Sequence, residues 1–328
     1  MQDRDITLPA PASSGQGGRG ITLLAAALAC LVLAPWVARQ DFYLHLAVLV
    51  CINIVITSGL SVLMRCGQVS LCHGAFVGLG AYAATLATMQ LGLPFAAGVL
   101  CAMLLTAALA LVLGAVMLRL TGVYFVLITF AFGELVRLGL LEWEGLTGGA
   151  NGITGVPPAE LLGMALDTKA AFYGLAAGIA LLSVAGLWRL FRSPAGHTID
   201  AVGENAALAE VSGLSVRRTQ LFAFVVASAM AGLGGALLAH YVGYISPESF
   251  TFSVSVGAII MLVVGGRAYI LGPVIGALVM TPLPEFFRGA VQSQNIFYGC
   301  AVILMLRFMP QGLAGLAARR GTREGGAR

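Results

Sequence analysis

Charged residues are scarce in this chain: 10% of its 328 residues are charged, whereas 59% are hydrophobic. A soluble domain usually carries about 25% charged residues, and one soluble core cannot bury this much apolar surface. The composition therefore excludes a soluble globular protein and indicates an integral membrane protein.

Lysine is almost missing as well: Lys169 is the single lysine among the 18 basic residues, and the formal net charge is +4. In a membrane protein, an excess of Arg is first a signal of topology. No basic run is interleaved with aromatic residues, so nucleic acid is not expected as a partner.

The chain also lacks a hydrolase elbow, a zinc motif and a P-loop, so it cannot hydrolyse ATP by the P-loop route.

The six cysteines include no C-x-x-C pair. The nearest approach to a metal-ligand pattern is Cys66, Cys72 and His73, which lie beside or inside apolar runs. We interpret the cysteines as small apolar packing residues and expect no metal site.

Long apolar runs fill most of the chain. A helix needs about 20 apolar residues to cross the hydrocarbon core of a bilayer. We predict an all-α, polytopic transmembrane helix bundle of about ten spans, some of them short or re-entrant. The eighth and ninth spans are short, and they are either half-helices or one broken pair around Gly265, Gly266 and Gly272. The predicted spans are 21–38, 44–65, 69–91, 95–119, 121–141, 171–191, 219–241, 252–265, 270–285 and 294–309. The first is expected to be uncleaved, with a cleaved signal ending at Cys30 as the alternative.

Arg is distributed unevenly between the two sides of this bundle. With ten spans both termini lie on one side, and the basic residues that fall on the other are Arg39, Arg137, Lys169 and Arg288. The positive-inside rule therefore predicts that both termini are cytoplasmic. We expect a disordered cytoplasmic tail over 1–20, the transmembrane domain over 21–316 and a basic cytoplasmic tail over 317–328.

Residues 192–218 form a charged segment between two apolar spans, on the predicted cytoplasmic side. Apolar residues at steps of three and four predict a helix of about four turns over 198–212; Pro194 and Gly196 break the chain before it, and Gly213 ends it. The stripe consists of Ile199, Val202, Ala206 and Ala209. The opposite face is acidic, whereas helices that lie in lipid headgroups usually carry Lys or Arg. We therefore expect this helix to contact a protein partner.

Polar groups in or beside the spans are candidates for a solute path. Gln68, Ser70 and His73 lie in the sequence GQVSLCHG, which is either a plain turn or a re-entrant segment that lines a path. Glu134 and Arg137 lie three residues apart on one helical face, either as a structural ion pair or as part of the path.

Two segments on the predicted outer side are rich in Gly, Pro and Asn, which are turn residues. They are 146–158, which contains Asn151, and 243–250. They are either plain loops or a mouth that receives solute from another protein.

Several blocks in one order carry a family resemblance from about Leu44 to Leu316. They include GQVSLCHGAFVGLGAYAATL, GVYFVLITFAFGELVRL, LTGGANGITGVP, FAFVVASAMAGLGGALLAHYVGYISPESF, LGPVIGALV and YGCAVILMLRFMPQGLAG. The chain resembles the LivM-type permeases, the membrane subunits of branched-chain amino acid ABC importers. The resemblance implies a multi-pass subunit of the bacterial inner membrane that is not itself an enzyme.

The resemblance also implies a set of partners. These are a second, LivH-like permease subunit, two cytoplasmic ATPase subunits that bind the ATP and Mg²⁺, and an extracytoplasmic solute-binding protein; this chain would need no cofactor. The permease would offer the ATPases a coupling helix, and ENAALAEVSG resembles that element. The implied coupling residues are Glu204, Asn205, Ala206, Ala207 and Gly213.

The chain departs from the family pattern at three positions. Relatives usually carry two Arg where this chain has Asp200 and Gly203, which puts the charge of the ATPase contact in doubt. They also carry Gly where this chain has Cys72, which puts a close backbone approach there in doubt. Branched-chain or other hydrophobic amino acids are the expected solute, with urea or short amides as the alternative. A proton-coupled secondary transporter that uses Glu134 is the alternative from another class.

Overall fold

The computed structural model describes residues 41–161, 164–286, 299, 303 and 312–315. The predicted tails and the span 21–38 lie outside the described residues, as does most of the span 294–309. Within the described part, six helical stretches are long and apolar enough to cross a membrane. The prediction of an all-α, polytopic membrane bundle is confirmed, and the total of ten spans stays a prediction.

The six stretches are α2 (Asp41–Arg65), α4 (Phe95–Met117), α5 (Val123–Glu142), α7 (Lys169–Phe191), α10 (Val216–Val242) and the run Pro247–Gly265, which joins η2 (Pro247–Phe250) to α11 (Phe252–Gly265). Two shorter helices pack among them: α3 (His73–Met89) and α12 (Gly272–Met280). The remaining elements are α6 (Glu144–Thr147), η1 (Gly149–Asn151), β1 (Ile153–Thr154), β2 (Glu160–Leu161), β3 (Met164–Ala165), α8 (Pro194–Glu204), α9 (Ala206–Val211), β4 (Tyr244–Ile245) and α13 (Leu283–Phe286).

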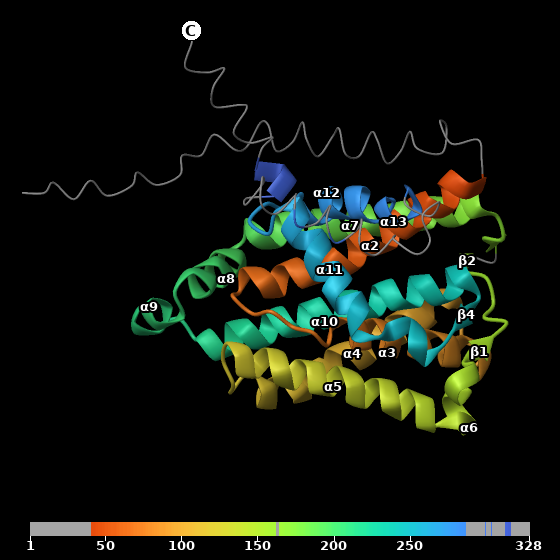
Figure 1. Cartoon of the computed structure of the whole chain (residues 1–328), viewed down its shortest axis with the longest axis horizontal. Helices are drawn as coiled ribbons and strands as arrows, with labels where there is room; N and C mark the ends of the chain where they lie inside the picture. Colours follow the sequence, from red (N-terminus) through yellow and green to blue (C-terminus); the bar gives the residue numbers. More distant parts are fainter. Residues whose placement is uncertain (1–40, 162–163, 287–298, 300–302, 304–311, 316–328) are drawn as a thin grey trace, which may run out of the picture.

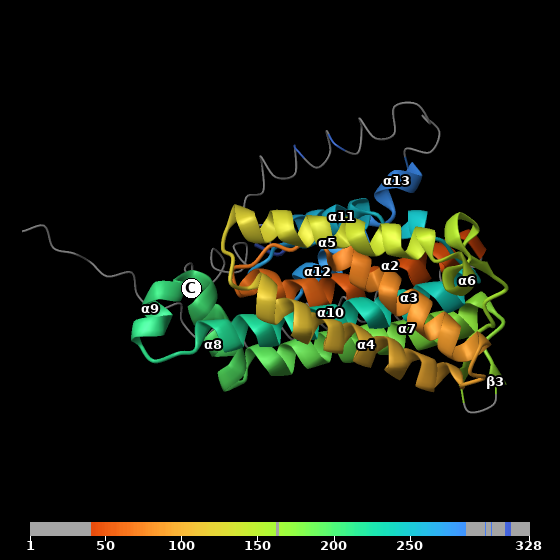
Figure 2. The same ribbon diagram turned by 90° about the horizontal axis from the view of Figure 1, so that it is seen from below.

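The long helices run roughly side by side along the longest axis of the molecule (Figure 1). In both views, α8 and α9 project beyond one end of the bundle, and α6 with the short strands lies at the other (Figure 1, Figure 2). We call these the α8–α9 end and the strand end. At the strand end β1 pairs antiparallel with β4, Ile153 opposite Ile245. The two segments predicted to form a mouth therefore meet.

Helix α10 lies at the centre of the bundle, where it packs against α2, α3 and α4. A Cβ atom on Gly80 of α3 would lie 2.3 Å from the Cα atom of Gly232 in α10, so the two backbones are in contact at this point. Close contact between small residues holds membrane helices together where water does not drive their association.

The helix is interrupted between the predicted spans 252–265 and 270–285. Helix α11 ends at Gly265, Gly266 has a φ of 109°, and α12 begins at Gly272. With 9 residues, α12 is about 14 Å long, less than half of a hydrocarbon core of about 30 Å. The structure thus shows a break at Gly266 and a short α12, and whether the two predicted spans cross the membrane fully stays a prediction.

Candidate functional site

The segment predicted to be one helix over 198–212 is two helices, so that prediction is wrong. Helix α8 begins at Pro194, because proline fits the first turn of a helix and the Oγ atom of Ser193 accepts a hydrogen bond from the backbone N–H of Gly196. Asn205 then leaves the helical region, with φ −156° and ψ 99°, and its Oδ1 atom accepts a 3.0 Å hydrogen bond from the N–H of Leu208. An Asn side chain that caps a following helix competes with continuation of the preceding one.

Helix α9 forms the tip of this projection. The coupling candidates Glu204, Asn205, Ala206, Ala207 and Gly213 are all exposed. Apolar side chains are exposed among them: Leu208 to 61% and Val211 to 82%. Apolar groups presented together on a projecting turn are typical of a surface that another protein covers.

Helix α8 is held on the bundle. Its apolar residues Ile199 and Val202 are buried, and Asp200 forms an ion pair with Arg65 at the end of α2, at 2.6 Å. The acidic charge of Asp200 is therefore paired within this chain, and a change in the charge of the ATPase contact stays a prediction. Burial raises the pKa of the nearby Cys66 thiol to about 12, and the negative charge of Asp200 adds to the shift. This thiol is therefore protonated at neutral pH.

The segment 66–72 between α2 and α3 has non-helical backbone inside the bundle. The N–H of Leu71 donates to Oγ1 of Thr129 in α5, at 3.2 Å. Ser255 of α11 donates through Oγ to the Leu71 carbonyl at 2.6 Å, and the same Oγ accepts from the N–H of Gly74 at 2.7 Å. Side chains of two other helices thus satisfy this backbone, as a membrane interior requires. We call this segment the crossing: Cys66, Gln68, Ser70 and Cys72 in it are buried, whereas Gly67 and Val69 are exposed.

Three of the predicted path residues lie in or directly after this crossing. Gln68, Ser70 and His73 are buried, and the Nε2 atom of His73 lies 3.0 Å from the carbonyl oxygen of Ile56. Cys72 is also buried, with an ordinary φ of −88° and its Sγ atom 3.0 Å from Oγ of Ser70. Because this backbone conformation suits any residue, the departure from Gly at position 72 is accommodated.

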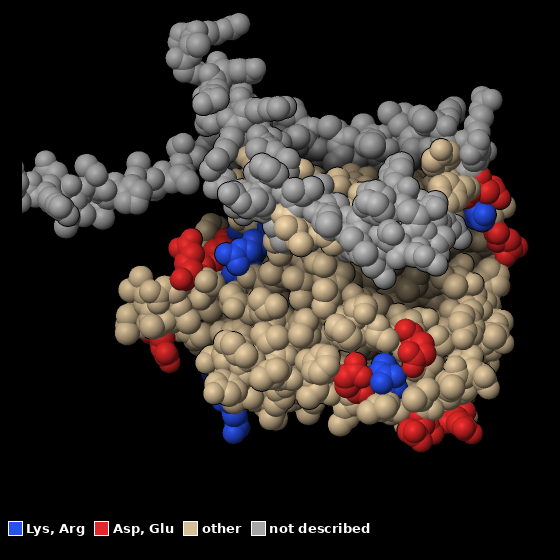
Figure 3. Space-filling model, viewed as in Figure 1, with Lys and Arg blue, Asp and Glu red and all other residues tan. Residues whose placement is uncertain are grey.

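Glu134 belongs to a group of three charged side chains on α5 and η2. Arg137 donates to Glu134 at 2.9 Å and to Glu248 at 3.0 Å. The contact between Arg137 and Glu248 joins residues 111 positions apart, and no local spacing in the sequence points to it. Figure 3 shows how few charged side chains interrupt the face of the bundle over α5, α10 and α11.

The structure does not bring Asn151 to the other path candidates. Asn151 is exposed in η1 at the strand end, where its carbonyl oxygen accepts a 3.2 Å hydrogen bond from the Tyr244 hydroxyl. The candidates thus divide among the crossing 66–72 with His73, the charged group on α5 and η2, and the strand end. Thr129 and Ser255, which sequence reasoning missed, hold the crossing in place; a lone hydroxyl in an apolar run gives no signal of such a role.

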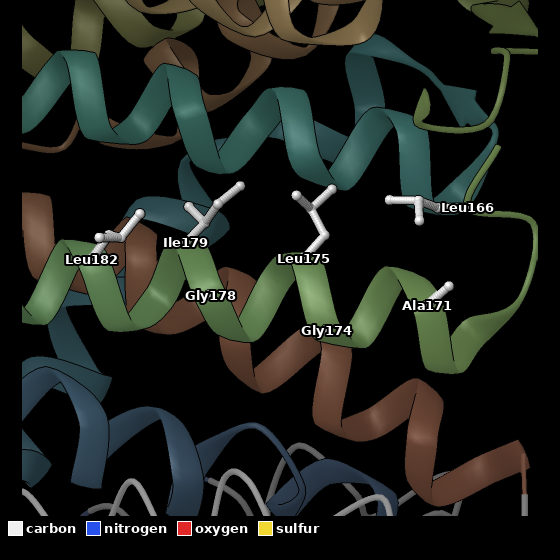
Figure 4. A pocket seen from close by; sticks show the side chains of 7 residues that line it. All are labelled: Leu166, Ala171, Gly174, Leu175, Gly178, Ile179 and Leu182. Carbon is white, nitrogen blue, oxygen red and sulfur yellow. The ribbon is translucent and has the colours of Figure 1, made fainter. Parts of the chain in front are cut away.

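A cavity of about 360 Å³ lies along α7. Its lining side chains come from one face of this helix and the preceding loop (Figure 4). All are apolar, so the cavity offers no group that would hold the charged ends of a zwitterion. The lining residues are Leu166, Ala171, Gly174, Leu175, Gly178, Ile179 and Leu182.

Comparison with known proteins places this architecture in a family. Residues 42–309 match the model of the branched-chain amino acid transport system permease component. The chain belongs to this family. It is 32% identical to the high-affinity branched-chain amino acid transport system permease protein LivM of Escherichia coli (strain K12), over 92% of this chain and 77% of that protein. The LivM protein of Salmonella typhimurium (strain LT2) is 31% identical over the same shares.

More distant relatives share part of the chain. The xylose transport system permease protein XylH of Escherichia coli (strain K12) is 31% identical over 32% of this chain and 28% of that protein. No solved structure matches the chain. Family membership confirms the resemblance seen in the sequence: the chain is an ABC permease component of the LivM type, and a permease component is not itself an enzyme.

Proposed function

We propose that this permease carries branched-chain amino acids across the bacterial inner membrane, driven by ATPase subunits that dock on α9. The projection of α9, with its exposed apolar side chains Leu208 and Val211, carries this proposal. The family and the LivM relatives support the choice of solute. The other partners are a LivH-like second permease subunit and an extracytoplasmic solute-binding protein, with ATP and Mg²⁺ on the ATPases.

The α8–α9 end is proposed to be cytoplasmic and the strand end to face outward. Arg65 is the last residue of α2 and Arg217 lies in the first turn of α10, so both lie at the α8–α9 end. Glu142 and Glu144 lie at the junction of α5 and α6, at the strand end. An excess of Arg on one side of a multi-pass protein marks the cytoplasmic side. Both termini are proposed to be cytoplasmic, as the sequence predicts.

The charged group on α5 and η2 is proposed to face the solute path or the second permease subunit. Glu134 lies 11 residues after the start of α5, about 17 Å along the helix axis, and α5 is the least buried of the six long stretches. Charged side chains at that depth do not face lipid, because their transfer into hydrocarbon costs several kcal/mol. The crossing with Gln68, Ser70 and His73 and the outer mouth with Asn151 are proposed as further parts of the path.

Uptake measurements test this function. We would measure uptake of labelled leucine and labelled urea in cells with and without the gene, and again with ATP depleted and the proton gradient kept. ATP-dependent leucine uptake that disappears on deletion is the expected result. Loss of urea uptake alone would keep the ABC mechanism and change the solute. Uptake that continues after ATP is depleted would contradict the ATPase coupling and favour the proton-coupled alternative through Glu134.

A further inference from the structure

One side chain joins the ends of α2 and α7 to the middle of α8 at the α8–α9 end. Arg65, the last residue of α2, donates from Nε to Oδ1 of Asp200 at 2.8 Å and from Nη2 to Oδ2 at 2.6 Å. Its Cζ atom also lies 3.9 Å from the ring centroid of Phe191, the last residue of α7. The planar guanidinium thus pairs with α8 in bidentate fashion and stacks on α7.

The backbone of α8 also touches the ends of both spans. A Cβ atom on Gly203 would lie 1.8 Å from the Arg65 carbonyl oxygen, and one on Gly196 would lie 2.3 Å from the Leu190 carbonyl oxygen. Only glycine allows such an approach without a shift of the backbone. Helix α8 is therefore in direct backbone contact with the ends of α2 and α7.

Helix α9 differs from α8 in this respect. It follows the extended residue Asn205, and five of its six residues are exposed, Ala209 being the buried one. Helix α2, on the other side of the junction, is the most buried of the six long stretches and packs against α7, α10, α11 and α12. A displacement that reaches α2 thus reaches the centre of the bundle.

We propose that Arg65 is a positioning residue that makes α8 move together with the ends of α2 and α7, so that a displacement applied to α9 reaches the spans. This inference rests on the proposed function, since it takes the displacement to come from docked ATPases. The side chains of Arg65 and Asp200 are 17% and 34% exposed, so the pair is partly shielded from water. Lys at position 65 would keep the charge but lose the bidentate contact and the stacking.

The test measures solute moved per ATP hydrolysed. The importer is purified whole through a tag on this chain and reconstituted in vesicles with its binding protein, and leucine uptake and ATP hydrolysis are followed together. We expect R65K and D200N to retain subunit assembly and ATP hydrolysis while uptake per ATP falls about tenfold, as for loss of a charged hydrogen bond. The exchange R65D/D200R should recover part of that loss. R192K is the matched control, because Arg192 stacks on Trp188 at 4.2 Å in the same region.

The outcomes separate this inference from the proposed function. Unchanged uptake per ATP in both R65K and D200N would overturn the inference, and so would a loss of assembly and hydrolysis in proportion to uptake, which marks a purely structural role. The wild-type complex tests the function. If this complex hydrolyses ATP but moves another solute, the uptake per ATP hydrolysed is measured with that solute. If no ATPase subunit copurifies, the proposed function fails and the inference with it.

Discussion

Val211 offers the sharpest test of α9 as the docking element. Its side chain is 82% exposed, so V211A removes two methyl groups that this chain does not itself bury. If an ATPase subunit covers the tip, the lost burial amounts to about 0.8 kcal/mol per group, or about 1.6 kcal/mol. The affinity for the ATPase should then fall about 15-fold, with no change in the melting temperature of the permease.

Val202 provides the matched control, because the same substitution falls on the buried side of the projection. Val202 lies in α8 and is 3% exposed, so V202A leaves a cavity and costs about 2 kcal/mol of folding free energy. We expect V202A to lower the melting temperature while it removes no atom that an ATPase touches. V211A should therefore lower the affinity for the ATPase and leave the melting temperature unchanged, whereas V202A should mainly lower the melting temperature.

The assay uses the two permease subunits in nanodiscs, titrated with the ATPase subunits, together with a thermal unfolding scan of each variant. An affinity of V211A within about twofold of wild type would refute the reasoning, since an exposed apolar tip that loses two methyl groups without effect is not covered by the partner. A fall in the melting temperature of V211A as large as that of V202A would also refute it, because it would mean that the chain itself buries the tip.

Three further perturbations give distinct expectations. Replacing Ala206 with Arg should abolish uptake while the membrane level of the protein stays normal; normal uptake would remove α9 from the coupling path. Replacing Ser255 with Ala removes the hydrogen bonds to Leu71 and Gly74 and should cost about 1–3 kcal/mol for each buried group left unpaired, read as a lower melting temperature; an unchanged value would mean that other groups satisfy the crossing. Replacing Lys169 with Ala breaks only its exposed ion pair with Asp41 and should change stability by less than about 1 kcal/mol; a larger loss in the same scan would contradict this.

The long helices could be predicted from sequence because their signal is local. Apolar runs that match the thickness of a bilayer coincide with α2, α4, α5, α7 and α10 within a few residues. The coupling candidates are exposed as a group in the Ala-rich stretch between two apolar spans, and their coupling role stays a prediction. Each of these features is read from residues close together in the chain.

Other features depend on contacts that no local pattern encodes. The pair of Arg65 with Asp200 joins residues 135 positions apart, and the bond between Ser255 and Leu71 joins residues 184 apart. The break at Asn205 was missed for another reason: the apolar stripe continues on both sides of it, so periodicity alone predicts one helix. The side chain of Asn205 caps the second helix and interrupts the stripe without altering its spacing.

The two departures from the family pattern in α8 belong to one arrangement. An Arg at position 200 would face the guanidinium of Arg65, and any side chain at 203 would collide with the Arg65 carbonyl oxygen. Asp200 and Gly203 are therefore both consequences of the position of Arg65 at the end of α2. Because Asp200 is paired internally, the carboxylates left for a partner beside the apolar tip are those of Glu204 and Glu210, both exposed. A cognate ATPase is thus expected to present an apolar groove flanked by basic side chains.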